Sequence, residues 1–149
     1  MSEPVEVADA NVLVALALAE HVDHEAARLW VTQVARFATC PMTETALVRL
    51  LLNPAVTVGA DGRPLTIDQA IGAVKAISAL PNAEFLADTT SLTDARALTR
   101  HVTGHRQVTD TYLLNLAIAH GGVLATFDTK IRASLKPFDR KHVHVISER

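Results

Sequence analysis

The chain has 149 residues and a mass of 16.0 kDa, which is the usual size of one compact domain, and we expect a single domain over residues 1–149. Hydrophobic residues make up 49% and charged residues 20%, a globular composition that excludes a disordered or collagen-like chain. The net charge of -2 lacks the basic excess common in nucleic-acid-binding proteins, and the single cysteine excludes an intramolecular disulfide.

Two features of the N-terminal region bear on location. The longest apolar run, residues 12–19, is far shorter than the roughly 20 residues that a membrane-spanning helix needs. Acids and no Lys or Arg precede it, which is the reverse of a signal peptide. The sequence therefore predicts no membrane span and a cytoplasmic protein.

The first part of the chain alternates strand-like and helix-like segments. Residues 5–9 predict a short strand that ends at Asp9, and the apolar residues after Asn11 follow helical spacing. A second helix is predicted after Asp23, and the next strand covers residues 37–40. Two strands with two helices between them are thus predicted before residue 41.

The middle of the chain continues the alternation with two helices. Thr43 is predicted as the N-cap of a helix over residues 44–53, and Thr66 as the N-cap of the next. Residues 53–64, rich in Pro and Gly, predict a loop. A third strand is predicted over residues 83–88.

The last third adds helices capped by Ser91 and Thr109. Residues 91–102 are predicted as the first of these helices. The remaining strands are predicted at residues 122–127 and 143–146, with a short basic helix after the former. Strands alternating with helices predict an α/β fold with a mainly parallel sheet of about five strands, covered on both faces.

Four acids occupy equivalent places in this alternation. Asp9 and Asp128 end strands, while Glu44 and Asp110 lie in the first turns of helices. In an open parallel sheet these positions lie along one edge, where ligands bind, so the four side chains can converge. Clustered carboxylates need a counter-charge, and Mg2+ or Mn2+ is the cation that suits oxygen ligands.

Each acid also has a purely structural interpretation. Aspartates at strand ends open helices through Asx turns, and acids in first helical turns are favoured by the helix dipole. Two further acids, Asp88 and Asp94, lie near strand and helix ends and are alternatives to any of the four. The joint placement of the four acids, rather than any one of them, favours a site.

Three segments together resemble PIN domains, and in particular the VapC toxin ribonucleases of bacterial toxin-antitoxin pairs. They are DANVLVALALAEHVDHEAARLW, PMTETALVRLL and VTDTYLLNLAIAHGGVLATFD. The resemblance runs from about Val5 to Ile146. It implies a three-layer α/β/α fold, an RNA substrate, a cognate antitoxin and one or two Mg2+ ions held by the acids Asp9, Glu44, Asp110 and Asp128.

The resemblance also implies a mechanism. A Mg2+ ion held by Asp9 and Asp110 would activate a water for attack on an RNA phosphodiester. Glu44 and Asp128 would orient waters, act as general base or hold a second ion. Asn11 and Thr126 are candidate supporting residues because each lies two residues from an aspartate of the set.

Basic residues near the last two acids are candidates for RNA phosphate contacts, although a solvated charged surface is the stronger explanation for them. They are Arg96, Arg100, His105, Arg106, Lys130 and Arg132. The charge is uneven along the chain, because the N-terminal end is acidic and the C-terminal end from Lys130 onward is basic.

Two further expectations concern surfaces and strand pairing. The apolar stretches VLVALALA and ALVRLLL are expected to leave exposed helix faces for an antitoxin and for a homodimer. Glu6 interrupts the first strand, which otherwise resembles the apolar strand of the family, so its pairing is expected to be weakened or displaced.

Two other functions compete with the nuclease. A phosphotransfer domain with Asp9 as the phosphorylated group is disfavoured, because position 11 is Asn rather than a second acid. A non-catalytic PIN-like module that binds RNA or a partner is the main alternative, and the presence of all four acids weighs against it.

Overall fold

The computed structural model describes residues 3–57, 63–94 and 96–147. Five strands form one sheet in the order β3-β2-β1-β4-β5, and every neighbouring pair is parallel. The strands are β1 (Glu6–Ala8), β2 (Phe37–Thr39), β3 (Ala83–Phe85), β4 (Val123–Thr126) and β5 (Val143–Val145). The predicted parallel sheet is confirmed.

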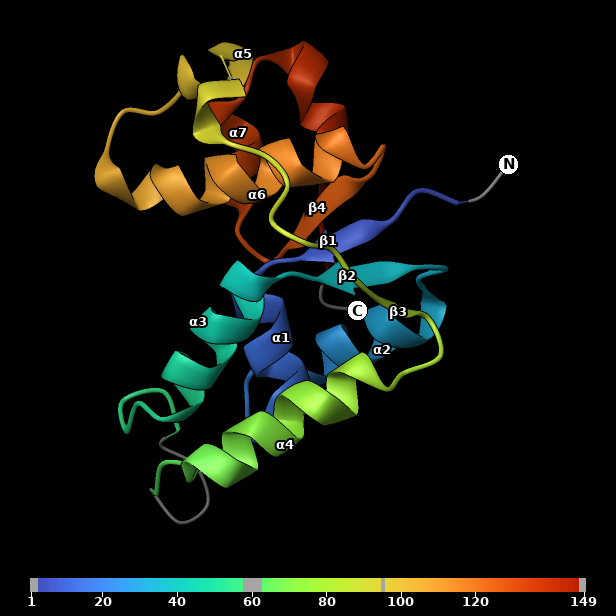
Figure 1. Ribbon diagram of the computed structural model, residues 1–149, viewed down its shortest axis with the longest axis vertical. Helices are drawn as coiled ribbons and strands as arrows, with labels where there is room; N and C mark the ends of the chain where they lie inside the picture. The colour runs from blue at the N-terminus through green and yellow to red at the C-terminus, as the bar shows by residue number, and fades with distance from the viewer. Residues whose placement is uncertain (1–2, 58–62, 95, 148–149) are drawn as a thin grey trace.

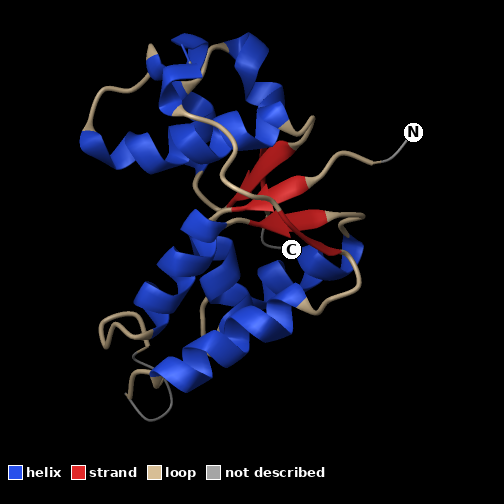
Figure 2. Ribbon diagram, viewed as in Figure 1, coloured by secondary structure: helices blue, strands red, loops and turns tan. Residues whose placement is uncertain are grey.

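Helices cover both faces of the sheet, as Figures 1 and 2 show. On one face lie α1 (Ala10–Ala17), α2 (His24–Gln33), α3 (Pro41–Leu51) and α4 (Ile67–Ser78). On the other lie α5 (Arg96–Thr99), α6 (Val108–Ala119) and α7 (Thr129–Ser134), joined by the 3-10 turns η1 (Leu92–Asp94), η2 (His105–Gln107) and η3 (Pro137–His142). The fold is therefore a three-layer α/β/α sandwich. The described residues contain no helix that could cross a membrane.

Each face of the sheet has its own hydrophobic core. Leu13, Phe37 and Leu47 belong to the core beneath α1 to α4, and Leu116 and Leu124 to the core beneath α6 and α7. The stretch VLVALALA lies mostly within the first core, and so does much of ALVRLLL. The expectation that these stretches expose docking faces is wrong for VLVALALA, because α1 is enclosed by the sheet and its neighbouring helices, and in ALVRLLL the exposed apolar side chain is that of Leu52.

Two predicted helix starts are displaced. Helix α3 begins at Pro41, whose fixed φ suits a first helical position, and Thr43 lies inside the first turn, where its hydroxyl accepts from Cys40 N–H at 3.0 Å. Helix α6 begins at Val108 because η2 runs directly into it, so Thr109 is not its cap. The predicted cap at Thr66 is confirmed by its hydrogen bond from Gln69 N–H.

Two predicted elements are shorter than expected. Strand β3 ends at Phe85 rather than at residue 88, because its partner β2 turns into α3 after Thr39 and leaves nothing to pair with. The predicted helix over residues 91–102 is divided into η1 and α5, and the Ser91 hydroxyl accepts from Thr93 N–H in a local turn that competes with a helix. Part of the predicted loop, residues 58–62, lies outside the described residues.

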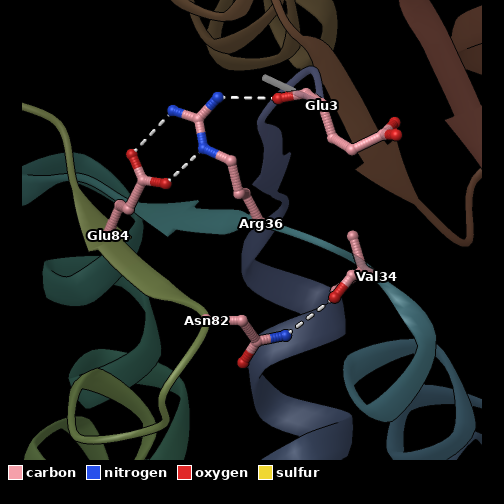
Figure 3. A network of polar contacts seen from close by, with 5 residues as sticks. All are labelled: Glu3, Val34, Arg36, Asn82 and Glu84. Atoms are coloured by element: carbon pink, nitrogen blue, oxygen red, sulfur yellow. Dashed lines mark hydrogen bonds and ion pairs between the residues drawn. The ribbon is translucent and has the colours of Figure 1, made fainter. Parts of the chain in front are cut away.

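The edge strand β3 is held by a polar network at its start (Figure 3). Arg36, just before β2, makes a bidentate pair with Glu84 of β3 at 2.6 and 2.9 Å and also donates to the backbone oxygen of Glu3. Asn82 donates to the backbone oxygens of Val31 and Val34. The planar guanidinium fixes both strands in register, since it bonds both carboxylate oxygens at once.

Glu6 pairs with both β2 and β4, so the expectation that it disturbs its strand is wrong. Its carboxylate accepts from Trp30 Nε1 at 2.8 Å and from His144 Nδ1 at 2.7 Å. Burial acts to raise the pKa of Glu6, but these two hydrogen bonds outweigh burial and hold the pKa below its usual range. The bond to Glu6 in turn raises the pKa of His144.

These shifts predict a stability contribution confined to a window of pH. Because the pKa of Glu6 is lowered, its contribution to the free energy of unfolding is complete above about pH 4.5. Because the pKa of His144 is raised, its contribution is complete below about pH 6.5 and is lost as the pH rises through the folded-state pKa. In urea unfolding, His144→Gln should therefore cost at most about 1 kcal/mol near pH 5.5 and less near pH 8.5. Arg28→Gln, which breaks an exposed pair with Glu25, is the control, and an equal loss at both pH values for His144→Gln would contradict the assignment.

Candidate active site

Asp9 is fixed where β1 turns into α1. It is the N-cap of α1, only 9% exposed, and its carboxylate accepts from Ala10 N–H at 2.7 Å and from the Thr126 hydroxyl at 2.8 Å. Burial raises the pKa of Asp9, the two hydrogen bonds oppose this rise, and the nearby carboxylate of Asp128 adds to it. The Asp9 carboxyl is thus held rigidly beside a second acid.

The hydroxyl of Thr126 ties two aspartates together. Thr126 ends β4 and is fully buried. It donates to Asp9 and accepts from Asp128 N–H at 3.1 Å. Since β1 and β4 are neighbouring parallel strands, this one side chain fixes the relative position of the acids that follow them.

Asp128 caps α7 with the Asx turn expected of its position. Its carboxylate accepts from Lys130 N–H at 2.8 Å, and the residue is half-buried. The interpretation of Asp128 as a helix cap is therefore correct. The carboxylate nevertheless lies close enough to Asp9 and Asp110 to raise the pKa of both.

Asp110 lies in the first turn of α6 and is half-buried. Its carboxylate makes no hydrogen bond or ion pair with the described residues. Burial, together with the charges of Asp9 and Asp128, raises the pKa of Asp110 from 3.8 to about 7. The charges of Asp9, which precedes α1, and of Asp128, which precedes α7, thus act on Asp110 in α6.

Glu44 lies in the first turn of α3, the helix that follows β2. Its carboxylate accepts from the Thr39 hydroxyl at 2.7 Å, and Thr39 ends β2 beside β1. This contact repeats the arrangement of Thr126 and Asp9 one strand away. Sequence reasoning missed Thr39, although a threonine that ends a buried strand shortly before an acid was a usable signal.

A cavity of about 290 Å³ opens beside the aspartates. It is lined by Arg106, Gln107, Asp110, Asp128, Lys130 and Ile131. Two of the predicted basic residues, Arg106 and Lys130, therefore lie beside two of the acids, and within the described residues neither forms an ion pair with them. Arg106 and Lys130 thus share a cavity with Asp110 and Asp128 without forming ion pairs with them.

The other predicted residues are more scattered. Arg132 lines a different cavity, and Arg100 is exposed after α5 and is not among the residues lining the acidic one. Arg96 begins α5, and its side chain lies outside what the structure describes. Asn11 is exposed in the first turn of α1.

The two alternative acids lie apart from this cluster. Asp88 is exposed and lines a separate cavity of about 420 Å³ that also includes Arg49 and Thr109. Asp94 is exposed in η1. Neither of them contributes to the pKa shifts of Asp9 or Asp110.

The donor set suits a hard divalent cation. Asp128 adds to the raised pKa of Asp9, and both add to that of Asp110, so these carboxylates need a positive charge, and oxygen ligands favour Mg2+ or Mn2+. As they stand, no three Asp, Glu, His or Cys side chains among the described residues are close enough together to hold an ion. Among the described residues, Asp110 has no ion-pair partner that would fix its carboxylate.

Comparison with known proteins agrees with this architecture. The family model described as "PIN domain" matches residues 7–134. Ribonuclease VapC29 of Mycobacterium tuberculosis is 43% identical over 122 residues, which cover 81% of this chain and 84% of that protein. Ribonuclease VapC44 of the same organism is 37% identical over 132 residues, with 87% and 89% covered, and ribonuclease VapC38 is 42% identical over 125 residues, with 83% and 84% covered. The chain therefore belongs to the PIN domain family.

Proposed function

We propose that this protein is a divalent-metal-dependent endoribonuclease that hydrolyses RNA phosphodiester bonds. The observation that carries the proposal is the group of three aspartates at the carboxyl edge of a parallel sheet. Asp128 adds to the raised pKa of Asp9, Asp9 and Asp128 add to the raised pKa of Asp110, and none of the three has an ion-pair partner among the described residues. Relatives named as ribonucleases, which align along most of the chain, support the choice of RNA as substrate. Mg2+ is the proposed ion, with Mn2+ as an alternative.

Asp9, Asp110 and Asp128 would hold the ion, and Glu44, in the first turn of α3, is proposed to act with them. When bound, a divalent ion lowers the pKa of a water and offsets the charge that develops on the phosphate. The protein groups supply position: Thr126 fixes the Asp9 carboxylate, and Thr39 fixes that of Glu44. Glu44 is the proposed group that orients the attacking water or accepts its proton.

Arg106 and Lys130 are proposed to bind RNA phosphate, because both line the cavity that contains Asp110 and Asp128. A phosphodiester lying across this cavity would meet cationic side chains beside the acids. Asn11, exposed in the first turn of α1, is a weaker candidate for a polar contact to the same strand.

We further propose that the protein is the toxin of a type II toxin-antitoxin pair, that a cognate antitoxin restrains it in the cytoplasm, and that it forms a homodimer. The VapC names of its relatives support the first two of these proposals. Exposed apolar side chains on the α3 and α4 side of the molecule, at Leu52, Ile67 and Ile71, support a protein partner.

The experiment is cleavage of a cellular RNA mixture by antitoxin-free protein with Mg2+, with Mn2+ and with EDTA, beside Asp9→Asn. We expect discrete fragments with metal and none with EDTA or with the variant, whose folding is checked by circular dichroism. Equal cleavage by Asp9→Asn would refute the assigned site. Binding of RNA without cleavage under any condition would favour the non-catalytic module instead.

A further inference from the structure

A second cavity lies on the other side of α7 from the acidic one. It has a volume of about 460 Å³ and is lined by Thr129, Arg132, Ala133, Arg140, Val145 and Ser147. Residues 129, 132 and 133 share one face of α7, because positions three and four apart are neighbours on a helix. Lys130 and Ile131 of the same helix line the acidic cavity instead. Helix α7 therefore separates the two cavities.

The second cavity is cationic. Its described lining residues include two arginines and no acid, and neither arginine forms an ion pair with a described residue. Arg140 is half-buried, and its Nε donates to Leu135 O at 3.1 Å, which anchors the side chain while its terminal NH2 groups make no other hydrogen bond with the described residues. Residues 130–147 carry five Lys or Arg against one Asp, so the surrounding surface is also basic.

These groups match the chemistry of a phosphodiester. A guanidinium presents a planar fork of N–H donors that fits two phosphate oxygens, and the hydroxyls of Thr129 and Ser147 are further donors in the same cavity. We infer that Arg132 and Arg140 form a second phosphate-binding subsite for the RNA strand, separate from the cavity that contains the acids. This inference rests on the proposed ribonuclease function.

The position of α7 ties this subsite to the acids. Asp128 caps the helix, and Arg132 lies one turn later, about 6 Å along the helix axis at 1.5 Å per residue. One RNA strand can therefore place one phosphate at the aspartates and another at the arginines. An acidic peptide could also meet two arginines, but the adjoining aspartates are proposed to hold a cation that takes a phosphodiester. RNA is favoured because Arg106 and Lys130 continue the line of cations past the acids.

Binding to the inactive Asp110→Asn protein tests the subsite directly. Fluorescence anisotropy with a short labelled single-stranded RNA is measured in EDTA over a series of salt concentrations. We expect Arg132→Gln and Arg140→Gln each to weaken binding about tenfold, and to reduce the slope of log K against log salt by about 0.7. Arg132→Gln is the decisive variant, because Arg140 also donates to the backbone oxygen of Leu135 and its replacement could disturb the fold.

Lys75→Gln is the matched control, because it removes one exposed positive charge from α4 on the opposite face of the sheet. Equal loss in this control, or unchanged binding by Arg132→Gln and Arg140→Gln, would overturn the subsite. Binding of a labelled acidic peptide, with no binding of the labelled RNA, would overturn it as well.

Cleavage separates this inference from the proposed function. In the active protein, Arg132→Gln should lower kcat/KM for a long RNA by about tenfold and leave a dinucleotide substrate unaffected. If the parent protein cleaves RNA but Arg132→Gln lowers kcat/KM equally for the long RNA and for the dinucleotide, the subsite is wrong and the nuclease proposal stands. If the parent cleaves nothing while binding still depends on both arginines, the nuclease is wrong and the subsite stands.

Discussion

Asp110→Asn should lower RNA cleavage by more than about 100-fold and yet make the metal-free protein more stable at neutral pH. Mutation of a group that supports a metal ligand lowers activity or metal affinity by about 10–100-fold, so loss of a proposed ligand itself should lower activity by more. The stability gain has a physical cause: burial, together with the charges of Asp9 and Asp128, raises the pKa of Asp110 to about 7, so keeping this carboxylate ionised at neutral pH destabilises the folded state.

The sign of the pH dependence follows from that shift. The unfolded carboxyl ionises near pH 3.8 and the folded one near pH 7, so Asp110 destabilises the folded state increasingly between these values and by a constant amount above them. The advantage of Asp110→Asn in thermal unfolding with EDTA should therefore be absent below about pH 3.8 and reach its plateau near pH 7. Each kcal/mol corresponds to roughly 2–4 °C in Tm for a domain of this size.

Added Mg2+ should reverse this order, because the ion stabilises the parent and not the variant. Asp94→Asn is a suitable control, since that acid is exposed in η1 and outside the cluster. A pH-independent stability difference between Asp110→Asn and the parent would show that Asp110 does not carry the raised pKa.

The parallel sheet and the placement of the acids could be predicted from the sequence because both follow from periodicity. Apolar strands that end in Asp9 and Asp128 put these residues at one edge in any parallel arrangement. The structure adds that β1 and β4 are neighbours in the sheet, which places Asp9 and Asp128 after adjacent strands.

What could not be predicted depends on contacts between distant segments. The polar partners of Glu6 are Trp30 and His144, which lie 24 and 138 residues away, so the strand seemed interrupted in the sequence but is intact in the fold. The boundary at Thr109 was misplaced because a 3-10 turn, rather than a side-chain cap, satisfies the start of α6. The two-cavity arrangement around α7 likewise depends on where η3 packs.

Thr126→Val should weaken metal-dependent cleavage by about 10–100-fold without removing any acid. The substitution keeps the shape of the side chain but removes the hydroxyl that donates to Asp9 and accepts from Asp128 N–H. Asp9 is almost fully buried, so the loss of this donor leaves its carboxylate less well solvated and raises its pKa further. Two buried polar groups lose a partner, and the free energy of unfolding should fall by about 1–3 kcal/mol.

The dependence of the defect on pH separates a positioning role from simple loss of stability. Because a raised pKa keeps Asp9 protonated to higher pH, the cleavage defect of Thr126→Val should shrink as the pH rises, whereas a folding defect would not follow the ionisation of one carboxyl. Thr126→Ser retains the hydroxyl and should cleave RNA like the parent, with only a small loss of stability from the missing methyl group. If Thr126→Ser and Thr126→Val lose activity equally at every pH, packing at the end of β4 matters and the hydrogen bonds to the two aspartates do not.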